Sequence, residues 1–173
     1  MEQQEQLNFS WDNAMEEWLV NPGFCFAAAM AHLDDGAIHA AVPAKGGLGW
    51  STSFKEDYKE KILQDDGSTE KIMAISEGAG LKHAIKTGQR PKWDFYLGGK
   101  KYFITQFDED FVTEVSSYPV LLAQRPNMGV VVTSTDSQII LAFYDEEKRQ
   151  TPGNCKKGLL HFADYVQAGS ASE

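Results

Sequence analysis

The sequence predicts an α+β fold in which helices cover the faces of a central antiparallel sheet. Two observations lead to this prediction. The expected elements follow the order helix, hairpin, helix, several strands and helix, without the strand–helix alternation that builds parallel sheets. The strand segments of the second half are also separated by short turn sequences, which is typical of an antiparallel meander.

The composition excludes several classes of protein. The chain has 173 residues and a formal net charge of −9, which fits one acidic domain and makes nucleic-acid binding unexpected, because phosphates attract basic surfaces. No apolar run approaches the roughly 20 residues that cross a bilayer. The sequence MEQQEQLNFS does not resemble a secretory leader, and Cys25 and Cys155 lie far apart. We therefore expect a cytoplasmic protein with reduced thiols.

The charges are distributed unevenly along the chain. Residues 1–20 and 108–114 are acidic without basic partners, whereas residues 82–101 hold six basic residues against Asp94 alone. A second basic group comprises Lys148, Arg149, Lys156 and Lys157. Two interpretations stay open: ordinary solvated surface charge, or a basic face that is steered electrostatically toward an acidic partner.

The first element is predicted as an amphipathic helix that begins after Ser10, a favourable N-cap residue. Its apolar positions follow helical spacing at Trp11, Met15, Trp18 and Leu19, and Asn21-Pro22-Gly23 ends it. A hairpin follows, in which the segments 24–33 and 37–42 flank an acidic turn. Residues 43–49 are predicted as a flexible connection.

The segment 54–75 is predicted as a second, solvent-exposed hairpin, because Asp65-Asp66-Gly67-Ser68 is a strong turn sequence. Ser76 then begins a short helix that ends at Gly88. Strands are expected over 95–99, 101–107, 111–115, 118–124, 129–135 and 139–145, with Asp108-Glu109-Asp110 as one of the turns.

The last helix is the most clearly predicted element. Thr151 caps it, Pro152 occupies its first position, and an apolar stripe repeats with helical spacing. The stripe comprises Cys155, Leu159, Phe162, Ala163 and Val166, and His161 faces away from it.

The sequence contains no arrangement typical of an active site. The four histidines lack metal-ligand spacing, and Gly46-Gly47-Leu48-Gly49 lacks the Lys-Ser/Thr of a phosphate loop. No nucleophile elbow of the G-x-S-x-G type is present. We therefore expect neither enzymatic activity nor a metal ion or cofactor.

Three segments, taken in order, resemble the profilin family. They are Ser10-Trp11-Asp12 at the first helix, LGGKKY at 97–102, and the closing strand and helix with ILAFYDE at 140–146, TPGNC at 151–155 and ADYV at 163–166. The extended segment before Ser76 and the sequence YDEEK at 144–148 look most like the protozoan branch of apicomplexan and related alveolate cells.

The resemblance implies a profilin-like fold, with the N- and C-terminal helices on one face of the sheet and a short helix on the other. It also implies a domain over 10–168, an extra hairpin arm at 54–75, a flexible tail at 1–9 and a flexible end at 169–173. The protein would be a monomer that binds monomeric actin, and the arm could be an additional contact for actin.

A second site implied by the resemblance takes proline-rich peptides, such as segments of formins, between the terminal helices. Its matching positions are Trp11, His39, Tyr165 and Val166. The alternative interpretation is that Trp11 only packs the two helices together. Ala14, His39 and Ala171 stand where many or some members carry an aromatic residue. Fewer stacked rings predict weakened or narrower peptide binding.

The actin face implied by the resemblance uses one strand, one strand end and the start of the last helix. The matching positions are Lys101, Ile104, Gln106, Arg125, Thr151, Gly153, Asn154, Lys157 and His161. Basic residues around 100–101 and 156–157 fall on this face, which suits an acidic partner such as actin. Phosphoinositide binding through residues 82–101 is a weaker expectation.

Two other classes of domain have a similar content of elements. A sensor of the PAS type would hold a small ligand and need a polar-lined cavity. A trafficking scaffold of the longin or roadblock type would lack the pairing of Trp11 and Tyr165 across the terminal helices.

Overall fold

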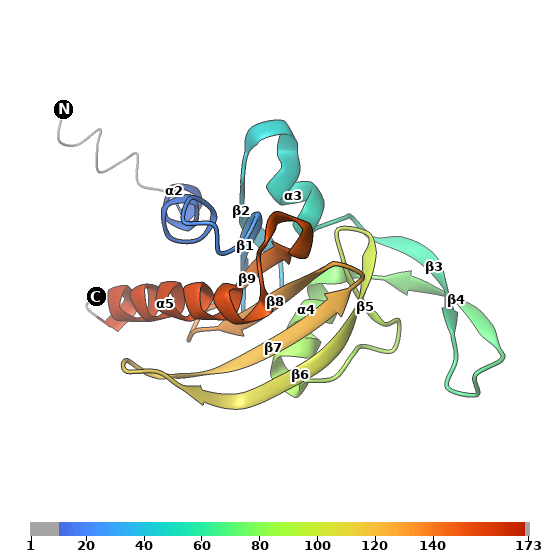
Figure 1. The fold of residues 1–173 in the computed structure, drawn as a ribbon. Helices are drawn as coiled ribbons and strands as arrows, with labels where there is room; N and C mark the ends of the chain where they lie inside the picture. Colours follow the sequence, from blue (N-terminus) through green and yellow to red (C-terminus); the bar gives the residue numbers. More distant parts are fainter. Residues whose placement is uncertain (1–10, 172–173) are drawn as a thin grey trace.

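The computed structural model describes residues 11–171, so the proposed cap Ser10 and the tail predicted at 1–9 lie outside the described residues. A seven-stranded antiparallel sheet with the order β2-β1-β9-β8-β7-β6-β5 forms the centre (Figure 1). Its strands are β1 (Ala27–His32), β2 (Ile38–Val42), β5 (Phe95–Leu97), β6 (Lys100–Val112), β7 (Ser117–Arg125), β8 (Met128–Ser134) and β9 (Gln138–Asp145).

Helices pack on both faces of this sheet. They are α2 (Trp11–Met15), which continues into the π-helical turn η1 (Glu16–Val20), α3 (Leu48–Ser53), α4 (Glu77–Thr87) and α5 (Pro152–Ala171). Two short 3-10 helices, η2 (Lys45–Gly47) and η3 (Glu146–Lys148), also lie within residues 11–171. The predicted α+β fold is therefore confirmed, and none of the helices described is long and apolar enough to cross a membrane.

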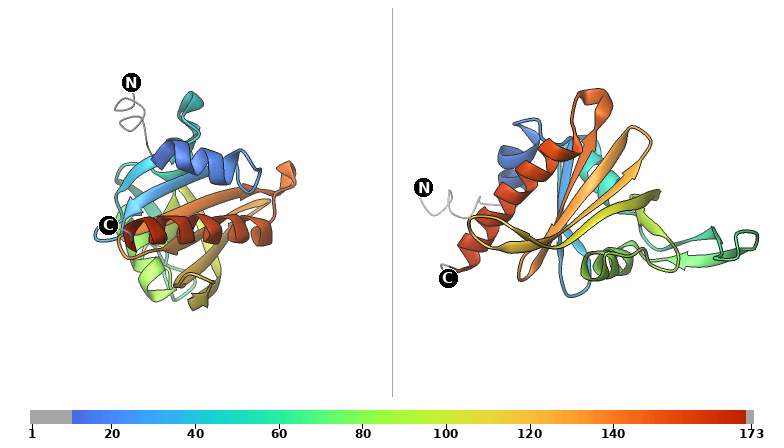
Figure 2. Two further views of the ribbon diagram at one scale, coloured as in Figure 1. Left: turned by 90° about the vertical axis from the view of Figure 1, so that its left-hand side faces the viewer. Right: turned by 60° about the horizontal axis from the view of Figure 1, so that its bottom comes forward.

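Alternating strand residues divide the core into two layers. One layer holds Met15 and Leu19 of the N-terminal helix and the whole apolar stripe predicted for α5, packed on Met30, Ile140 and other sheet residues. The other layer packs Leu81 and Ile85 of α4 on the opposite face. The terminal helices thus share one face and α4 covers the other, as Figure 2 shows.

The caps of the two longer helices agree with the sequence prediction. The Ser76 hydroxyl accepts the Ala79 amide at 3.4 Å, and α4 ends at Gly88 in a left-handed conformation with φ of 73°. The Thr151 hydroxyl accepts the Asn154 amide at 3.1 Å, which confirms the predicted start of α5.

The predicted flexible connection at 43–49 is wrong, because η2 and the first turn of α3 occupy it. Gly46 and Gly47 adopt positive φ angles that let the chain turn directly into α3. Gly49 then packs so closely on Val42 that an added Cβ would lie 2.5 Å from its backbone nitrogen. The glycines here therefore permit tight packing and do not confer mobility.

The predicted turn at Asp108-Glu109-Asp110 is also wrong, because β6 runs through it to Val112. The pairing of β6 with β7 shifts register between Asp108 and Phe111, and the Asp110 amide donates to the Asp108 carboxylate at 3.0 Å. The actual turn follows at 113–116, where the Thr113 amide donates to the Ser116 carbonyl at 2.8 Å. β5 pairs only with the start of β6, and acidic residues are favourable on such an open edge.

The predicted second hairpin is present and projects from the rest of the chain (Figures 1 and 2). It consists of β3 (Tyr58–Leu63) and β4 (Glu70–Ile75), and we call residues 54–75 the arm. At its tip the Asp66 carboxylate accepts hydrogen bonds from the Ser68 and Thr69 amides and from the Thr69 hydroxyl. These hydrogen bonds lower the pKa of Asp66 to about 2, and the bond from the Thr69 hydroxyl contributes most.

Both cysteines are reduced and lie in the core beneath α5. Burial raises the pKa of Cys25 to about 12 and raises the pKa of Cys155 well above its ordinary value. The two thiols are therefore apolar core groups, as the apolar stripe of the last helix predicted for Cys155.

Candidate binding surfaces

The first candidate surface is a group of stacked rings between the terminal helices. Trp18 stacks on Tyr165 with ring centroids 4.8 Å apart, and the two side chains remain 37% and 39% exposed. Phe162 lies between them and Trp11, at centroid distances of 6.2 Å from Trp18, 6.1 Å from Tyr165 and 6.4 Å from Trp11. We call Trp11, Trp18, Phe162 and Tyr165 the aromatic surface.

The local structure of the N-terminal helix determines which rings reach solvent. Met15 and Leu19 point into the core with no exposed surface. Trp18, on η1, instead lies against Tyr165 of α5. The sequence analysis assigned Trp18 to the apolar stripe and missed it as a site residue. Its position seven residues after Trp11, on the same side of a helix, was the available signal.

The other predicted residues of this site occupy different positions. Val166 is 3% exposed and belongs to the core layer beneath the rings. His39 stacks on His32 at a centroid distance of 4.4 Å, and its Nε2 lies 2.5 Å from the Gln138 side-chain oxygen. Ala14 has no ring and is buried, so it adds nothing to this surface. The structure therefore brings Trp11 and Tyr165 together and places His39 in a separate polar group.

The second candidate surface is a groove along the first half of α5. It has two adjoining parts of about 460 and 540 Å³, which share Gly153 and Lys156. The Lys156 ammonium lies 4.0 Å from the centroid of the Phe111 ring and bridges the groove. The first part also takes Gln106, Asp108, Val120 and Leu122, and the second takes Val112, Val115, Lys157, Leu160, His161 and Asp164. We call the whole the α5 groove.

Four of the residues predicted for the actin face line this groove, namely Gln106, Gly153, Lys157 and His161. Thr151 and Asn154 lie exposed at the start of α5, next to the groove. A Cβ added at Gly153 would meet nothing within 4 Å, so this end of the groove is open to a partner.

The remaining predicted residues are divided by a bulge in β6. The pairing of β6 with β7 skips Thr105, so Gln106 lies opposite Leu122 on the α5 face while Ile104 lies opposite Ala123 on the α4 face. Arg125 lies 5.7 Å from the Tyr102 ring centroid, and Tyr102 belongs to the α4 layer. Ile104 and Arg125 therefore do not join the α5 groove.

The Lys101 side chain is engaged within the chain. Its ammonium lies 3.0 Å from the Asp94 carboxylate and 5.0 Å from the Phe103 ring centroid. Asp94 also pairs with Arg90 at 2.8 Å, and Arg90 in turn pairs with Asp65 at 3.1 Å. Asp94 was already counted against the basic segment 82–101, so only Asp65 further reduces the excess of positive charge there.

The fold and these two surfaces define a small binding protein. An antiparallel sheet carries both terminal helices on one face, an aromatic surface between them and a groove lined by apolar, basic and acidic side chains. Within residues 11–171, no group of His, Cys, Asp or Glu side chains is arranged to hold a metal ion.

The family profile of profilin matches residues 9–170, so the chain belongs to the profilin family. It is 30% identical over 169 residues to a profilin of Plasmodium falciparum, covering 94% of this chain and 97% of that protein. It is 29% identical over 161 residues to a profilin of Plasmodium berghei, covering 90% and 91%. The resemblance to the protozoan branch is therefore confirmed.

Solved profilin structures share the fold. Profilin II of Acanthamoeba castellanii superposes with a TM-score of 0.62 at 20% identity, covering 93% of this chain and 99% of that one. A Schizosaccharomyces pombe profilin gives a TM-score of 0.56 at 17% identity, covering 91% and 96%. Family and fold support a non-enzymatic, actin-binding regulator of actin assembly, and they do not favour the PAS-type or longin-type alternatives.

Proposed function

We propose that this chain binds monomeric actin through the α5 groove and the exposed start of α5, and thereby regulates filament assembly. The observation that carries this proposal is the convergence of Gln106, Gly153, Lys157 and His161 on one groove, after they were selected by family resemblance alone. The groove joins exposed apolar side chains such as Val112 with Lys156 and Lys157, while Asp108, Glu114 and Asp164 also line it. Apolar contact ringed by charges of both signs suits a protein partner.

Actin polymerisation kinetics test this proposal. The variant with both Lys101→Glu and Lys157→Glu should bind monomeric actin about 10-fold more weakly or worse and lose its effect on polymerisation, because two attractive charges become repulsive. Lys157→Glu alone is the cleaner probe, since Lys101 also pairs with Asp94. Lys86→Glu is the matched control, because Lys86 is exposed on α4 across the sheet. Unchanged kinetics with the double variant would contradict the proposal.

We further propose that the aromatic surface binds proline-rich peptides, such as those of formins. A polyproline II helix has three residues per turn and no internal hydrogen bonds, so its prolines can stack on rings while its carbonyls accept bonds from ring donors. The stacked and partly exposed pair of Trp18 and Tyr165 supports this proposal. Buried Ala14 and the distinct position of His39 leave fewer rings, so we expect weak binding.

Intrinsic tryptophan fluorescence tests the peptide site. A proline-rich peptide should shift the emission of the wild-type chain, and Trp18→Ala should weaken binding about 5-fold or more, since stacked aromatic contacts contribute about 0.5–1.5 kcal/mol beyond the area that they bury. Trp50→Ala is the control, because Trp50 is 42% exposed but lies on α3. A titration that stays flat up to millimolar peptide would remove this site.

The arm is proposed as an additional contact for actin. Its outward face presents Lys59, Lys61, Leu63 and Ile72, and the last two are 53% and 63% exposed. Deletion of 62–71 should therefore lower the affinity for actin. The proposal also includes a monomeric state, a place with the actin cytoskeleton in the cytoplasm, and at most weak phosphoinositide binding.

A further inference from the structure

We propose that Glu77 is the positioning residue of the arm: its carboxylate holds the base of the arm against the β5–β6 turn and so fixes where the arm stands relative to the rest of the molecule. The effect on actin binding rests on the proposed function, whereas the effect on the arm itself does not.

Glu77 is a buried acidic residue whose carboxylate accepts four hydrogen bonds. It is 2% exposed at the first position of α4. One carboxylate oxygen accepts the amides of Lys55 at 3.0 Å and Gly98 at 2.7 Å. The other accepts the Gly99 amide and the Tyr58 hydroxyl, each at 2.7 Å. A buried carboxylate is costly unless it is satisfied in this way, so these four bonds form together.

These donors come from two segments that lie more than 35 residues apart in the chain. Lys55 and Tyr58 lie where the chain enters the arm, while Gly98 and Gly99 form the turn between β5 and β6. Both glycines have positive φ, of 61° and 78°, and their successive amides form a nest for an anion. A Cβ at Gly98 would lie 2.4 Å from the Thr52 carbonyl oxygen, so the turn admits only glycine there. We call this arrangement the Glu77 clasp.

The Tyr58 hydroxyl keeps its proton and therefore remains a donor. Burial, followed by the hydrogen bond to Glu77 and its negative charge, raises the pKa of Tyr58 well above its ordinary value. The Lys55 ammonium lies 4.3 Å from the centroid of the same ring.

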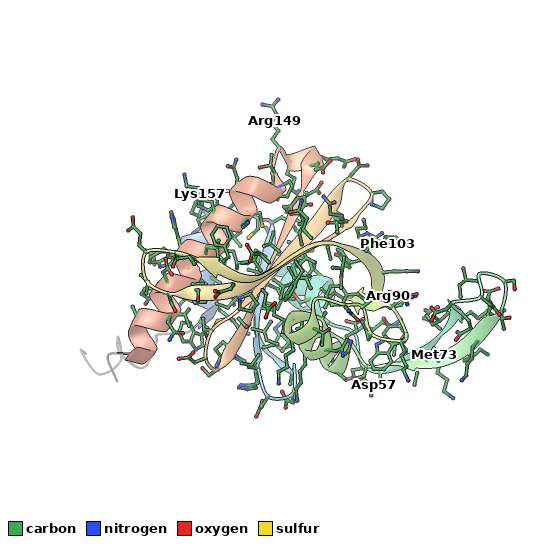
Figure 3. The ribbon with its side chains drawn as sticks, turned by 90° about the horizontal axis from the view of Figure 1, so that it is seen from below. Asp57, Met73, Arg90, Phe103, Arg149 and Lys157 are labelled. Carbon is green, nitrogen blue, oxygen red and sulfur yellow. The ribbon has the colours of Figure 1, made fainter. Side chains whose placement is uncertain are left out.

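A second connection holds the tip of the arm, but it is weaker. Asp65 at the tip pairs with Arg90, and their side chains are 96% and 52% exposed. Pairs this exposed contribute little, because water screens them and the side chains lose entropy. Figure 3 shows Arg90 near the arm, with Phe103 close by and Lys157 on α5 at the far side. The base of the arm is therefore the point at which its direction is fixed.

The Glu77 clasp also lies next to the proposed actin-binding residues. Gly99 directly precedes Lys100 and Lys101, the first residues of β6. A partner that contacts the α5 groove and the arm together requires a fixed distance between them, and a loosely attached arm would have to be ordered at a cost in affinity.

Hydrogen exchange tests the proposal without reference to any partner. In Glu77→Gln the side chain keeps its size, but its NH₂ group faces donors that it cannot pair with. We expect amides of β3 and β4 to exchange about 10-fold faster or more, with amides of β8 and β9 unchanged. Glu70→Gln makes the same charge change on the exposed face of the arm and is the control, so amide exchange should be unchanged in both pairs of strands. Unchanged exchange in the arm of Glu77→Gln would overturn the proposal.

Actin affinity separates positioning from a general loss of structure. Glu77→Gln should weaken binding about 5-fold in the full chain and have no further effect after deletion of 62–71. An equal loss in both backgrounds, or equally faster exchange in β8 and β9, would overturn the proposal. If Glu77→Gln does not fold, Tyr58→Phe, which removes one donor, takes its place. The same changes in amide exchange and actin affinity are then expected, with smaller magnitude. A wild-type chain that does not bind actin would overturn the proposed function, and the exchange measurement would still decide on Glu77.

Discussion

The seven-stranded sheet and the arm are both antiparallel, yet they are stabilised in different ways. Nearly every residue of β8 and β9 is buried between two layers of helices. In the arm, only Ile62 of β3 and Ile75 of β4 are fully buried, and most other side chains face solvent. The sheet is therefore stabilised by apolar burial on both faces, whereas the position of the arm depends on the polar contacts of Glu77.

This difference implies two levels of stability in one chain. Full burial of a large apolar side chain contributes roughly 1.5–3 kcal/mol, and more than a dozen such side chains lie on the strands of the sheet. An isolated two-stranded hairpin is marginal in water. We therefore expect the arm to open locally at a lower free energy than global unfolding requires.

The largest effect is expected in the sheet. Phe143 has no exposed surface and packs against Tyr102, with the ring planes tilted by 59° and the ring centroids 6.2 Å apart. Phe143→Ala should lower the free energy of unfolding by about 3–5 kcal/mol, because it removes apolar contacts and leaves a cavity. Urea denaturation followed by circular dichroism measures this change. A loss below about 1 kcal/mol would mean that the sheet is not the principal source of stability.

An intermediate effect, confined to the arm, is expected from Ile62→Ala. Ile62 is 2% exposed, so the substitution should speed amide exchange in β3 and β4 about 10-fold or more, since each 1.4 kcal/mol is a factor of ten. The midpoint of global unfolding should move little. Leu63→Ala is the matched control, because Leu63 is 53% exposed. A large shift of the global midpoint would show that the arm and the sheet unfold as one unit.

The smallest effect is a dependence on pH at the tip of the arm. The pKa of Asp66 is lowered from 3.8 to about 2, so the ionised form stabilises the turn above about pH 4, and this contribution is lost as the pH falls toward 2. A carboxyl-carbon NMR titration should give an Asp66 midpoint well below that of an ordinary aspartate. Asp66→Asn should remove this transition from the arm, whereas Asp65→Asn should leave it. An Asp66 midpoint near 4 would contradict the hydrogen bonds at the tip.

Much of the fold could be predicted because local chemistry determines it. Ser76, Gly88, Thr151 and Pro152 mark helix ends through caps and backbone preferences that depend on adjacent residues only. The Asp66 turn likewise follows from its own side chain and the two amides after it. These features do not depend on what the rest of the chain does.

The features that the sequence could not predict depend on neighbours far along the chain. The glycines at 46–49 resemble a flexible linker, and only contact with Val42 shows that Gly49 is tightly packed. Asp108–Asp110 resembles a turn, but pairing with β7 extends the strand through it. The bulge at Thr105 separates Ile104 from Gln106, although their spacing of two predicts a common face.

The candidate surfaces could be predicted only where they depend on neighbours close in the sequence. Lys157 and His161 lie one turn apart on α5, so helical spacing alone places them together in the groove. Trp18 was missed because its exposure depends on how η1 meets α5 at Tyr165. Lys101 was selected by family resemblance, which does not show that Asp94 and Phe103 engage it in the folded chain.

The two buried cysteines have a practical consequence for studying the arm. Maleimides react with exposed thiolates, and Cys25 and Cys155 are buried thiols whose pKa values are raised. The native chain therefore provides an unreactive background for chemical labelling at neutral pH. A single cysteine introduced at Ile72, which is 63% exposed, should accept a fluorophore selectively and report the direction of the arm.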